Sequence, residues 1–270
     1  MPTCNLKPSR DSKRRIRISD LSPADKVVAD SFIQIYRFED RKVAKVCQPA
    51  QLAQAKAMQY VREKTSLPVP EVYDAYIDEY ANRGVVIMEY VEGDVLQDVW
   101  ADLTAEQQCS IVAQLKGYME ELRTLKGIFI GPVDGSPGYD PTFETEEPFG
   151  PFKTESEFNE GLIKVMKMSR DSIWVEHVAD FLRALPQHNI VFTHADLAPR
   201  NILVRKDQIV AFLDWEMAGF YPEYWEYVKA LFYPDWESKW IKDNAVLKFL
   251  QPWPLEHAVL LHVQQIVQGW

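Results

Sequence analysis

The sequence contains few cysteines, and none of them forms a pair of the kind that binds zinc. Cys4, Cys47 and Cys109 are odd in number, far apart and in no C-x-x-C motif. This spacing argues against a disulfide framework and against a zinc site. A reducing compartment is the natural setting for such a chain, so we expect a cytoplasmic protein.

Long apolar runs and excess positive charge are also absent. No stretch reaches the roughly 18 to 20 apolar residues needed to cross a bilayer, and the N-terminal residues lack the apolar core of a signal peptide. The formal net charge of −10 repels polyanions. We therefore expect no membrane or nucleic-acid partner, but a small molecule, cationic or neutral, and no obligate protein partner.

The N-terminal third has the pattern of a small antiparallel sheet with one helix. Strands are predicted from β-branched and aromatic residues, and Pro49 opens an Ala-rich helical stretch. The predicted elements are a strand at 31–38, a turn at Glu39-Asp40, a strand at 41–47, a helix at about 49–64, a strand at 71–78, a turn at 82–84 and a strand at 85–90.

The rest of the chain is predicted to be mainly helical. Thr104 with Gln107, and Thr154 with Glu157, are capping boxes at the start of two helices. The many Gly and Pro residues of 127–151 predict a long loop between them. We therefore expect an α+β fold with an N-terminal extension at 1–30, an N-terminal lobe at 31–92 and a larger C-terminal lobe at 93–270.

Polar residues gather around one short strand in the C-terminal part. The apolar run Ile190 to Thr193 is followed by His194 and Asp196, and Pro199 prevents a helix from continuing. Residues 202–205 and 209–213 then form a predicted hairpin. Its return strand should bring Asp214 beside Asn201.

The expected cluster provides oxygen ligands. The carboxylate of Asp214 and the amide carbonyl of Asn201 suit Mg²⁺, which takes its other ligands from water and from nucleotide phosphates. Phosphoryl transfer also needs an acceptor for the proton of the attacking hydroxyl, and Asp196 is our candidate. Alternatively, Asp196 and Asp214 are a helix cap and a turn residue, and Lys45 is an ordinary strand lysine.

These motifs resemble a known family. H-A-D-L-A-P-R-N at 194–201 followed by F-L-D-W-E at 212–216 is similar to the aminoglycoside phosphotransferase and choline kinase family, particularly its short fungal-type members. Further segments agree, namely V-A-K at 43–45, L-P-V-P at 67–70, I-M-E-Y-V-E-G at 87–93 and Y-P-E-Y-W-E-Y at 221–227. The resemblance covers roughly residues 35–235 and implies a two-lobed, protein-kinase-like fold.

The resemblance also implies roles for individual residues. Asp196 would be the catalytic base, supported by His194, while Asn201 and Asp214 would hold Mg²⁺. Lys45 would contact the phosphates of ATP. Backbone groups of Met88, Glu89 and Val91 would bind adenine, and Glu216 would assist metal or substrate binding. The implied reaction moves the γ-phosphate of ATP to a hydroxyl of an aminoglycoside-, choline- or metabolite-like acceptor.

Two departures from the family pattern keep other functions open. Gln54 stands where the helix following the strand lysine should carry a glutamate, and no Gly-rich loop precedes Lys45. The alternatives are a pseudoenzyme that binds nucleotide or ligand without transfer, and a secondary-metabolism enzyme with other chemistry. Ala198 replaces the lysine of protein kinases, which disfavours peptide substrates. Glu223 and Glu226 could attract a cationic acceptor or simply lie on a solvated helix face.

Overall fold

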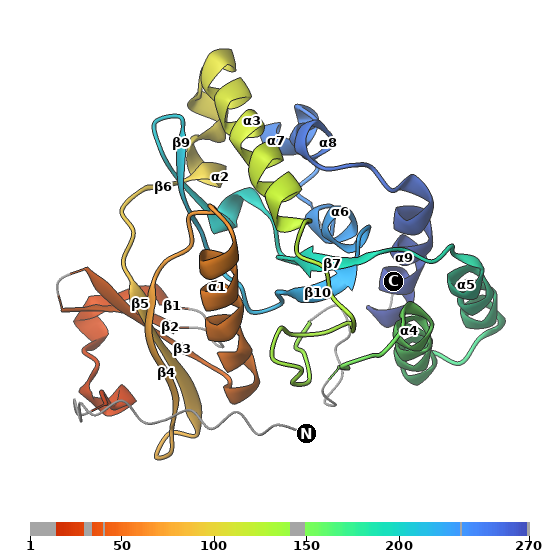
Figure 1. Ribbon diagram of the computed structural model, residues 1–270, viewed down its shortest axis with the longest axis horizontal. Helices are drawn as coiled ribbons and strands as arrows, with labels where there is room; N and C mark the ends of the chain where they lie inside the picture. The colour runs from red at the N-terminus through yellow and green to blue at the C-terminus, as the bar shows by residue number, and fades with distance from the viewer. Residues whose placement is uncertain (1–14, 30–33, 40, 141–148, 233, 269–270) are drawn as a thin grey trace.

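A computed structural model describes residues 15–29, 34–39, 41–140, 149–232 and 234–268. Figure 1 shows two lobes, with an antiparallel sheet and one helix on one side and most of the helices on the other. This confirms the predicted α+β, two-lobed, kinase-like architecture.

The N-terminal lobe is built on a five-stranded sheet in the order β1-β2-β3-β5-β4. All neighbouring strands pair antiparallel, and the central strand β3 pairs Lys45 with Ile35 of β2 and with Val86 of β5. The strands are β1 (Lys26–Ala29), β2 (Gln34–Phe38), β3 (Lys42–Cys47), β4 (Val72–Asp78) and β5 (Arg83–Glu89). Lys45 therefore projects from the middle of the sheet.

One helix covers a face of this sheet and contacts the second lobe. After a short 3₁₀ turn (Pro49–Leu52), α1 (Ala53–Lys64) buries Ala57, Met58 and Val61 in the main hydrophobic core. The ring of Tyr60 lies 5.6 Å from Phe192, which belongs to the other lobe. The helix therefore joins the two lobes through apolar contacts.

The C-terminal lobe combines helices with two small sheets. One sheet pairs β7 with β10, and the other has the order β6-β8-β9. The strands are β6 (Asp94–Val95), β7 (Ile190–Thr193), β8 (Ile202–Arg205), β9 (Gln208–Phe212) and β10 (Gly219–Pro222). The helices are α2 (Leu96–Val99), α3 (Ala105–Leu122), α4 (Glu155–Ser169), α5 (Ile173–Ala184), α6 (Trp225–Ala230), α7 (Lys239–Lys242), α8 (Ala245–Phe249) and α9 (Pro254–Val267).

Two hydrophobic cores hold this arrangement together. The larger one runs from Val43 of the N-terminal sheet through Leu115 of α3 to Phe212 of β9, so it crosses between the lobes. The second lies among α4, α5, α6 and α9, with Phe158 and Trp225 at its centre. Both cores pack against the segment from β7 to β10, which carries the polar cluster found in the sequence.

Most predicted elements are present, with shifts at their ends. The capping box at Thr104 starts α3, which ends at Leu122. At the start of α4 the Thr154 side chain accepts from the N–H of Glu157, but the Glu157 carboxylate accepts from the N–H of Lys153, so the second predicted capping box is only half formed. The predicted turn at 82–84 ends two residues too late, because the turn spans residues 79–82 and Arg83 and Gly84 already belong to β5. Asp40 and residues 31–33 of the first hairpin, and residues 141–148 of the long loop, lie outside the described residues.

Three strands were not predicted from the sequence. β6, which pairs with β8, lies in the part of the chain that was expected to be mainly helical. β1 lies within the segment assigned to an N-terminal extension and pairs with β2. β10 pairs with β7, matching Phe220 with Phe192, in a segment where no strand was expected. In the part of the chain that the structure describes, no helix combines the length and hydrophobicity needed to span a bilayer.

Candidate active site

The candidate site begins at the end of β7, where the chain turns sharply. Ala195 has a positive φ of 63°, and a 3₁₀ turn at Pro199–Asn201 follows. The loop therefore contains no α-helix, which agrees with the prediction made from Pro199. Asp196 Oδ2 accepts a hydrogen bond of 2.7 Å from Asn201 Nδ2, and Asp196 Oδ1 contacts the guanidinium of Arg200. The loop therefore gives each oxygen of the Asp196 carboxylate a partner, Asn201 for one and the half-exposed Arg200 for the other.

His194 connects this loop to the strand that carries Asp214. The backbone N–H of Asp196 donates to His194 Nδ1 at 3.2 Å, and His194 Nε2 lies 2.9 Å from the carbonyl oxygen of Leu213. Because Nδ1 accepts, Nε2 must carry the proton and donate. His194 is 1% exposed, so these contacts make it a structural bridge beneath Asp196.

A buried glutamate holds the same loop from below. Glu226 of α6 is 4% exposed, and its carboxylate accepts from the backbone N–H groups of His194 at 2.7 Å and Ala195 at 3.1 Å. Burial raises the pKa of Glu226, an effect that His194 and its N–H group oppose. Glu226 therefore neither attracts a cationic acceptor nor lies on a solvated helix face, the two interpretations made from the sequence. Its carboxylate accepts hydrogen bonds from the backbone of the loop.

Replacing Glu226 with glutamine should destabilise the protein. An amide offers one acceptor and one donor, so one of the two loop N–H groups would face a donor and lose its partner. Such a loss destabilises a fold by about 1–3 kcal/mol. Chemical denaturation would measure it. Glu223→Gln is the matched control, since a single oxygen of Glu223 accepts from the side chain and the backbone N–H of the exposed Asn189, at 3.1 and 3.3 Å, and an amide oxygen can do the same. An equal loss in both variants would contradict this role.

The hairpin of β8 and β9 brings Asn201 and Asp214 together, as predicted. The strands pair antiparallel, and beyond them the N–H of Leu213 donates to the carbonyl oxygen of Asn201 at 2.8 Å. Asp214 follows with a positive φ of 63°, which turns the chain away from the strand. The two candidate metal ligands therefore stand at the open end of one hairpin.

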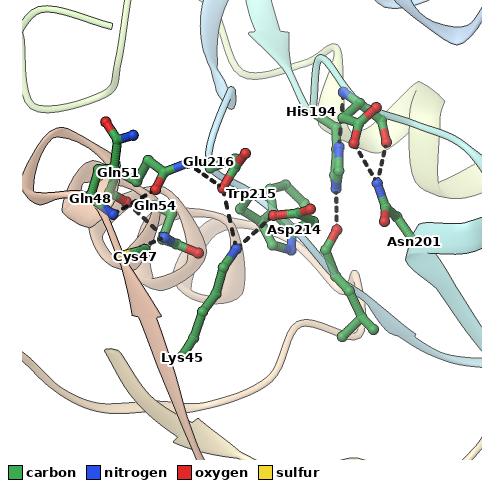
Figure 2. A network of polar contacts seen from close by, with 12 residues as sticks. Lys45, Cys47, Gln48, Gln51, Gln54, His194, Asn201, Asp214, Trp215 and Glu216 are labelled. Atoms are coloured by element: carbon green, nitrogen blue, oxygen red, sulfur yellow. Dashed lines mark hydrogen bonds and ion pairs between the residues drawn. The ribbon is translucent and has the colours of Figure 1, made fainter. Parts of the chain in front are cut away.

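Lys45 reaches this end of the hairpin from the other lobe (Figure 2). Its Nζ lies 2.6 Å from Asp214 Oδ1 and 3.5 Å from Glu216 Oε2, and its side chain is 4% exposed. Burial opposes the charge of Lys45, but the two carboxylates together raise its pKa. Burial alone would raise the pKa of Asp214, and Lys45 reverses this to a net lowering. Asp214 is therefore an anion that can bind a cation.

Glu216 is the second carboxylate of the Lys45 environment. Burial and the nearby charge of Asp214 raise the pKa of Glu216 to about 7, although Lys45 opposes the shift. Gln51 Nε2 donates to the same oxygen, Glu216 Oε2, at 2.9 Å. Figure 2 shows Gln51 and Glu216 approaching from opposite lobes. Glu216 thus links Lys45 to the turn that precedes α1.

Gln54, at the position of the expected helix glutamate, makes its hydrogen bonds within its own lobe. The Gln54 amide donates to the carbonyl oxygen of Gln51 at 2.8 Å and contacts Cys47 Sγ at 3.7 Å. Among the described residues, the carboxylates that Lys45 contacts are those of Asp214 and Glu216. Lys45 therefore has Glu216, two residues after Asp214, as its glutamate partner in place of a glutamate on α1.

Replacing Glu216 with glutamine should weaken ATP binding. Above pH 7, where Glu216 is mostly ionised, Lys45 would exchange a carboxylate for a neutral acceptor, and charge-assisted hydrogen bonds are roughly twice as strong as neutral ones. We expect a three- to fivefold increase in the dissociation constant, corresponding to about 0.7–1 kcal/mol. Isothermal titration calorimetry with Mg-ATP would measure it.

The informative companion variant is Gln54→Glu, which restores the family residue on the helix. Because Gln54 is 2% exposed and donates to a backbone carbonyl, a carboxylate there would lose this bond. We expect lower stability and no gain in affinity. Tighter ATP binding by this variant would show that the helix position, not Glu216, is the natural partner of Lys45.

The segment predicted to bind adenine lies at the end of β5 and the start of the connection to the second lobe. Met88 packs in the main core, and the N–H of Glu89 donates to the carbonyl oxygen of Glu71 at 2.8 Å. The N–H of Tyr90 donates to the carbonyl oxygen of Arg41 at 2.8 Å. Because the N–H groups of Glu89 and Tyr90 already donate within the protein, adenine would have to bind other backbone groups of this segment, such as the N–H of Val91.

A cavity of about 460 Å³ opens beside Asp196 in the C-terminal lobe. Asp196 and Arg200 line it on one side, and residues of α6, α7 and the segment between them line it on the other. Its volume falls within the range of small-molecule sites. A hydroxyl group bound here could approach the Asp196 carboxylate.

The residues present fit a magnesium ion. The anionic carboxylate of Asp214 and the amide carbonyl of Asn201 are hard oxygen donors, and two protein ligands are typical where phosphates supply others. The Asn201 amide nitrogen is turned toward Asp196, so its oxygen is the atom that can ligate. Asn201 thus contacts Asp196, the candidate proton acceptor, and leaves its oxygen for the candidate metal position.

The chain is similar to known phosphotransferases. A family model described as the phosphotransferase enzyme family matches residues 28–248. No curated protein sequence matches the chain. A ternary complex of a thermostable mutant of aminoglycoside phosphotransferase APH(4)-Ia with ADP and hygromycin B shares 18% identity and a TM-score of 0.61, over 90% of this chain and 86% of that one. The streptomycin–ATP complex of APH(2")-IIa shares 13% identity and a TM-score of 0.60, over 91% and 85%.

Proposed function

Because the chain belongs to the phosphotransferase enzyme family, we propose that it transfers the γ-phosphate of ATP, with Mg²⁺, to a hydroxyl group of a small molecule. The observation that carries this proposal is the convergence of Lys45, Asp214 and the Asp196–Asn201 pair at the junction of the two lobes. The structural relatives contain ADP or ATP in their complexes, which supports the choice of nucleotide.

Each residue has a defined task in this proposal. Lys45 contacts phosphate oxygens, exchanging its present bond to Asp214 for them, and Glu216 keeps its ammonium in place. Asn201 and Asp214 hold Mg²⁺, which neutralises charge on the phosphates when bound. Met88, Glu89 and Val91 border the adenine. In the same proposal, residues 31–92 form the nucleotide-binding lobe, and residues 93–270 form the lobe that carries the catalytic loop and the acceptor site.

Asp196 acts on the acceptor. Its carboxylate orients the hydroxyl group and takes its proton as the oxygen attacks phosphorus. One carboxylate oxygen is held by Asn201, and the other contacts Arg200, a half-exposed residue that can move aside. Thus Asn201 fixes the carboxylate while the Arg200-facing oxygen is available to substrate. His194 and Glu226 keep the loop in shape.

A cytoplasmic location is part of the proposal, because ATP is the phosphate donor and Cys47 and Cys109 are free thiols. The pseudoenzyme alternative rests on two departures, Gln54 and the absence of a Gly-rich loop before Lys45. The structure bears on the first of them. The contact of Glu216 with Lys45 weakens the argument from Gln54, since the lysine has a carboxylate partner after all.

The test is release of ADP from Mg-ATP in the presence of a panel of hydroxyl acceptors, with mass spectrometry of the products. We expect an acceptor-dependent, chelator-sensitive reaction. Binding of Mg-ATP without a phosphorylated product from any acceptor class would favour the pseudoenzyme, and the absence of nucleotide binding would refute the proposal.

A further inference from the structure

Arg200 is the one lysine or arginine within the loop H-A-D-L-A-P-R-N at 194–201, and it contacts the proposed proton acceptor. Its guanidinium donates to Asp196 Oδ1, while the other oxygen of that carboxylate accepts from Asn201. The side chain of Arg200 is 55% exposed, that of Asp196 is 13% exposed, and both line the cavity of the C-terminal lobe. The pair therefore lies where the loop faces the acceptor.

The backbone of Arg200 is held in place although its side chain is exposed. Arg200 is the middle residue of the 3₁₀ turn Pro199–Asn201, and the N–H of Asn201 donates to the carbonyl oxygen of Ala198 at 2.9 Å. The carbonyl oxygen of Asn201 accepts from the N–H of Leu213 at 2.8 Å, which ties the turn to the second strand of the hairpin. The long side chain can thus change its partner while its backbone stays beside Asp196.

The charge of Arg200 also acts at Asp214, the proposed metal ligand. Burial would raise the pKa of Asp214, but nearby cations, Lys45 first and Arg200 among the others, lower it instead. Arg200 therefore lies near the carboxylate of the acceptor side and near that of the metal side. In the proposed function, the phosphoryl group passes from the nucleotide to an oxygen held by Asp196, so it crosses the region where this charge acts.

The bond between Arg200 and Asp196 is easily exchanged for another. An ion pair whose arginine is half-exposed contributes little to stability, because water competes for its charge. Asp196 gives up its own charge when it takes the proton of the acceptor hydroxyl. At the same time negative charge lies on the three outer oxygens of the phosphoryl group. The guanidinium therefore loses one anion while another develops beside it.

We infer that Arg200 is a further catalytic residue, which moves from Asp196 to the phosphoryl group during transfer. The inference rests on the proposed function. As Asp196 takes the proton, the acceptor oxygen bonds to phosphorus, and the bond between phosphorus and ADP breaks with its electron pair leaving on ADP. The planar guanidinium of Arg200 donates to the phosphoryl oxygens during this exchange. Because this contact is stronger in the transition state than in bound ATP, it raises the rate and leaves the nucleotide affinity unchanged.

Aluminium fluoride added to Mg-ADP tests this contact, because it occupies the position of a planar phosphoryl group and requires neither turnover nor a known acceptor. The wild-type protein should bind Mg-ADP at least about tenfold more tightly with aluminium fluoride than without it. Arg200→Ala should lose most of this gain and bind Mg-ADP alone as the wild type does. Arg200→Lys keeps the charge without the planar fork and should lose the gain only in part. Calorimetry would measure all four affinities of each pair.

Arg205→Ala is the matched control. Arg205 is an exposed arginine of the same hairpin, and it donates to the carbonyl oxygen of Glu92 at 3.0 Å. This variant should keep the full gain from aluminium fluoride. An equal gain in Arg200→Ala would overturn the inference, and so would the absence of any gain in the wild type. Equal weakening of Mg-ADP with and without aluminium fluoride would also overturn it, because Arg200 would then act on the bound nucleotide or on the fold.

Hydrolysis of Mg-ATP, with water as the attacking hydroxyl group, is the second measurement. Arg200→Ala should lower the rate about 100-fold, the usual cost of removing one donor to a developing charge, and guanidinium ion at millimolar concentration should restore part of it. A faster rate would mean that Arg200 only covers Asp196, contrary to the inference. If the wild type bound no nucleotide, the proposed function would fail. Normal turnover by Arg200→Ala would refute the inference and leave that function in place.

Discussion

Replacing Asp196 with asparagine is expected to lower the rate of phosphoryl transfer by about 10²–10⁴-fold, the usual contribution of a positioned proton acceptor. Asparagine keeps the size of the side chain and can still contact Asn201, but its amide cannot take the proton of the attacking hydroxyl. The affinity for Mg-ATP should change little, because Lys45 and Asp214 remain. Initial rates of ADP release and calorimetry on the same preparation would measure both quantities.

The control for this variant is Asp235→Asn, which alters the other carboxylate of the cavity. Asp235 accepts from a backbone N–H in its own turn and lies at the exposed rim. We expect a change of less than about threefold, as for most surface substitutions. If Asp196→Asn retained normal turnover, another group would have to take the proton and the assignment of Asp196 would be lost.

Asp214→Asn should remove the magnesium dependence of nucleotide binding. The substitution takes away the proposed anionic ligand of the metal and also the counter-ion that lies 2.6 Å from Lys45. A single charge-assisted contact of this kind is worth about 1.5–3 kcal/mol, so Mg-ATP affinity should fall by about 10- to 100-fold. Titrations with ATP in the presence and absence of Mg²⁺ would show it.

Asp207→Asn, in the turn at the opposite end of the same hairpin, is the matched control. Its backbone carbonyl accepts from Gln114 at 2.7 Å, and this contact does not depend on its carboxylate. Nucleotide affinity should be unchanged. Undiminished magnesium dependence in Asp214→Asn would mean that the metal is held elsewhere.

The residues that act through local geometry could be predicted from the sequence. A short apolar strand, a proline-interrupted loop and a hairpin are local patterns, and together they place Asp196, Asn201 and Asp214 in one small volume. The structure brings these residues together as expected. His194 was assigned to the loop through the family resemblance, and its bonds to Leu213 and Asp196 agree with a supporting role.

The residues that act across the fold could not be predicted. Glu226 belongs to a short helix, and its contact with the N–H of His194 depends on how α6 packs under β7. The partnership of Gln51 with Glu216 spans 165 positions in the sequence. Spacing within the sequence carries no signal for either contact. The strand β10 was not predicted for the same reason, because it is formed by long-range pairing with β7 rather than by a local sequence pattern.

Lys45 belongs to one lobe, and both of its carboxylate partners belong to the other. Spreading the lobes would leave a buried ammonium without its counter-ions, which is strongly unfavourable in a low-dielectric interior. A nucleotide's phosphates can replace those carboxylates, because they bring negative charge to the same place. We therefore expect the relative position of the lobes to depend on which anion this single side chain contacts.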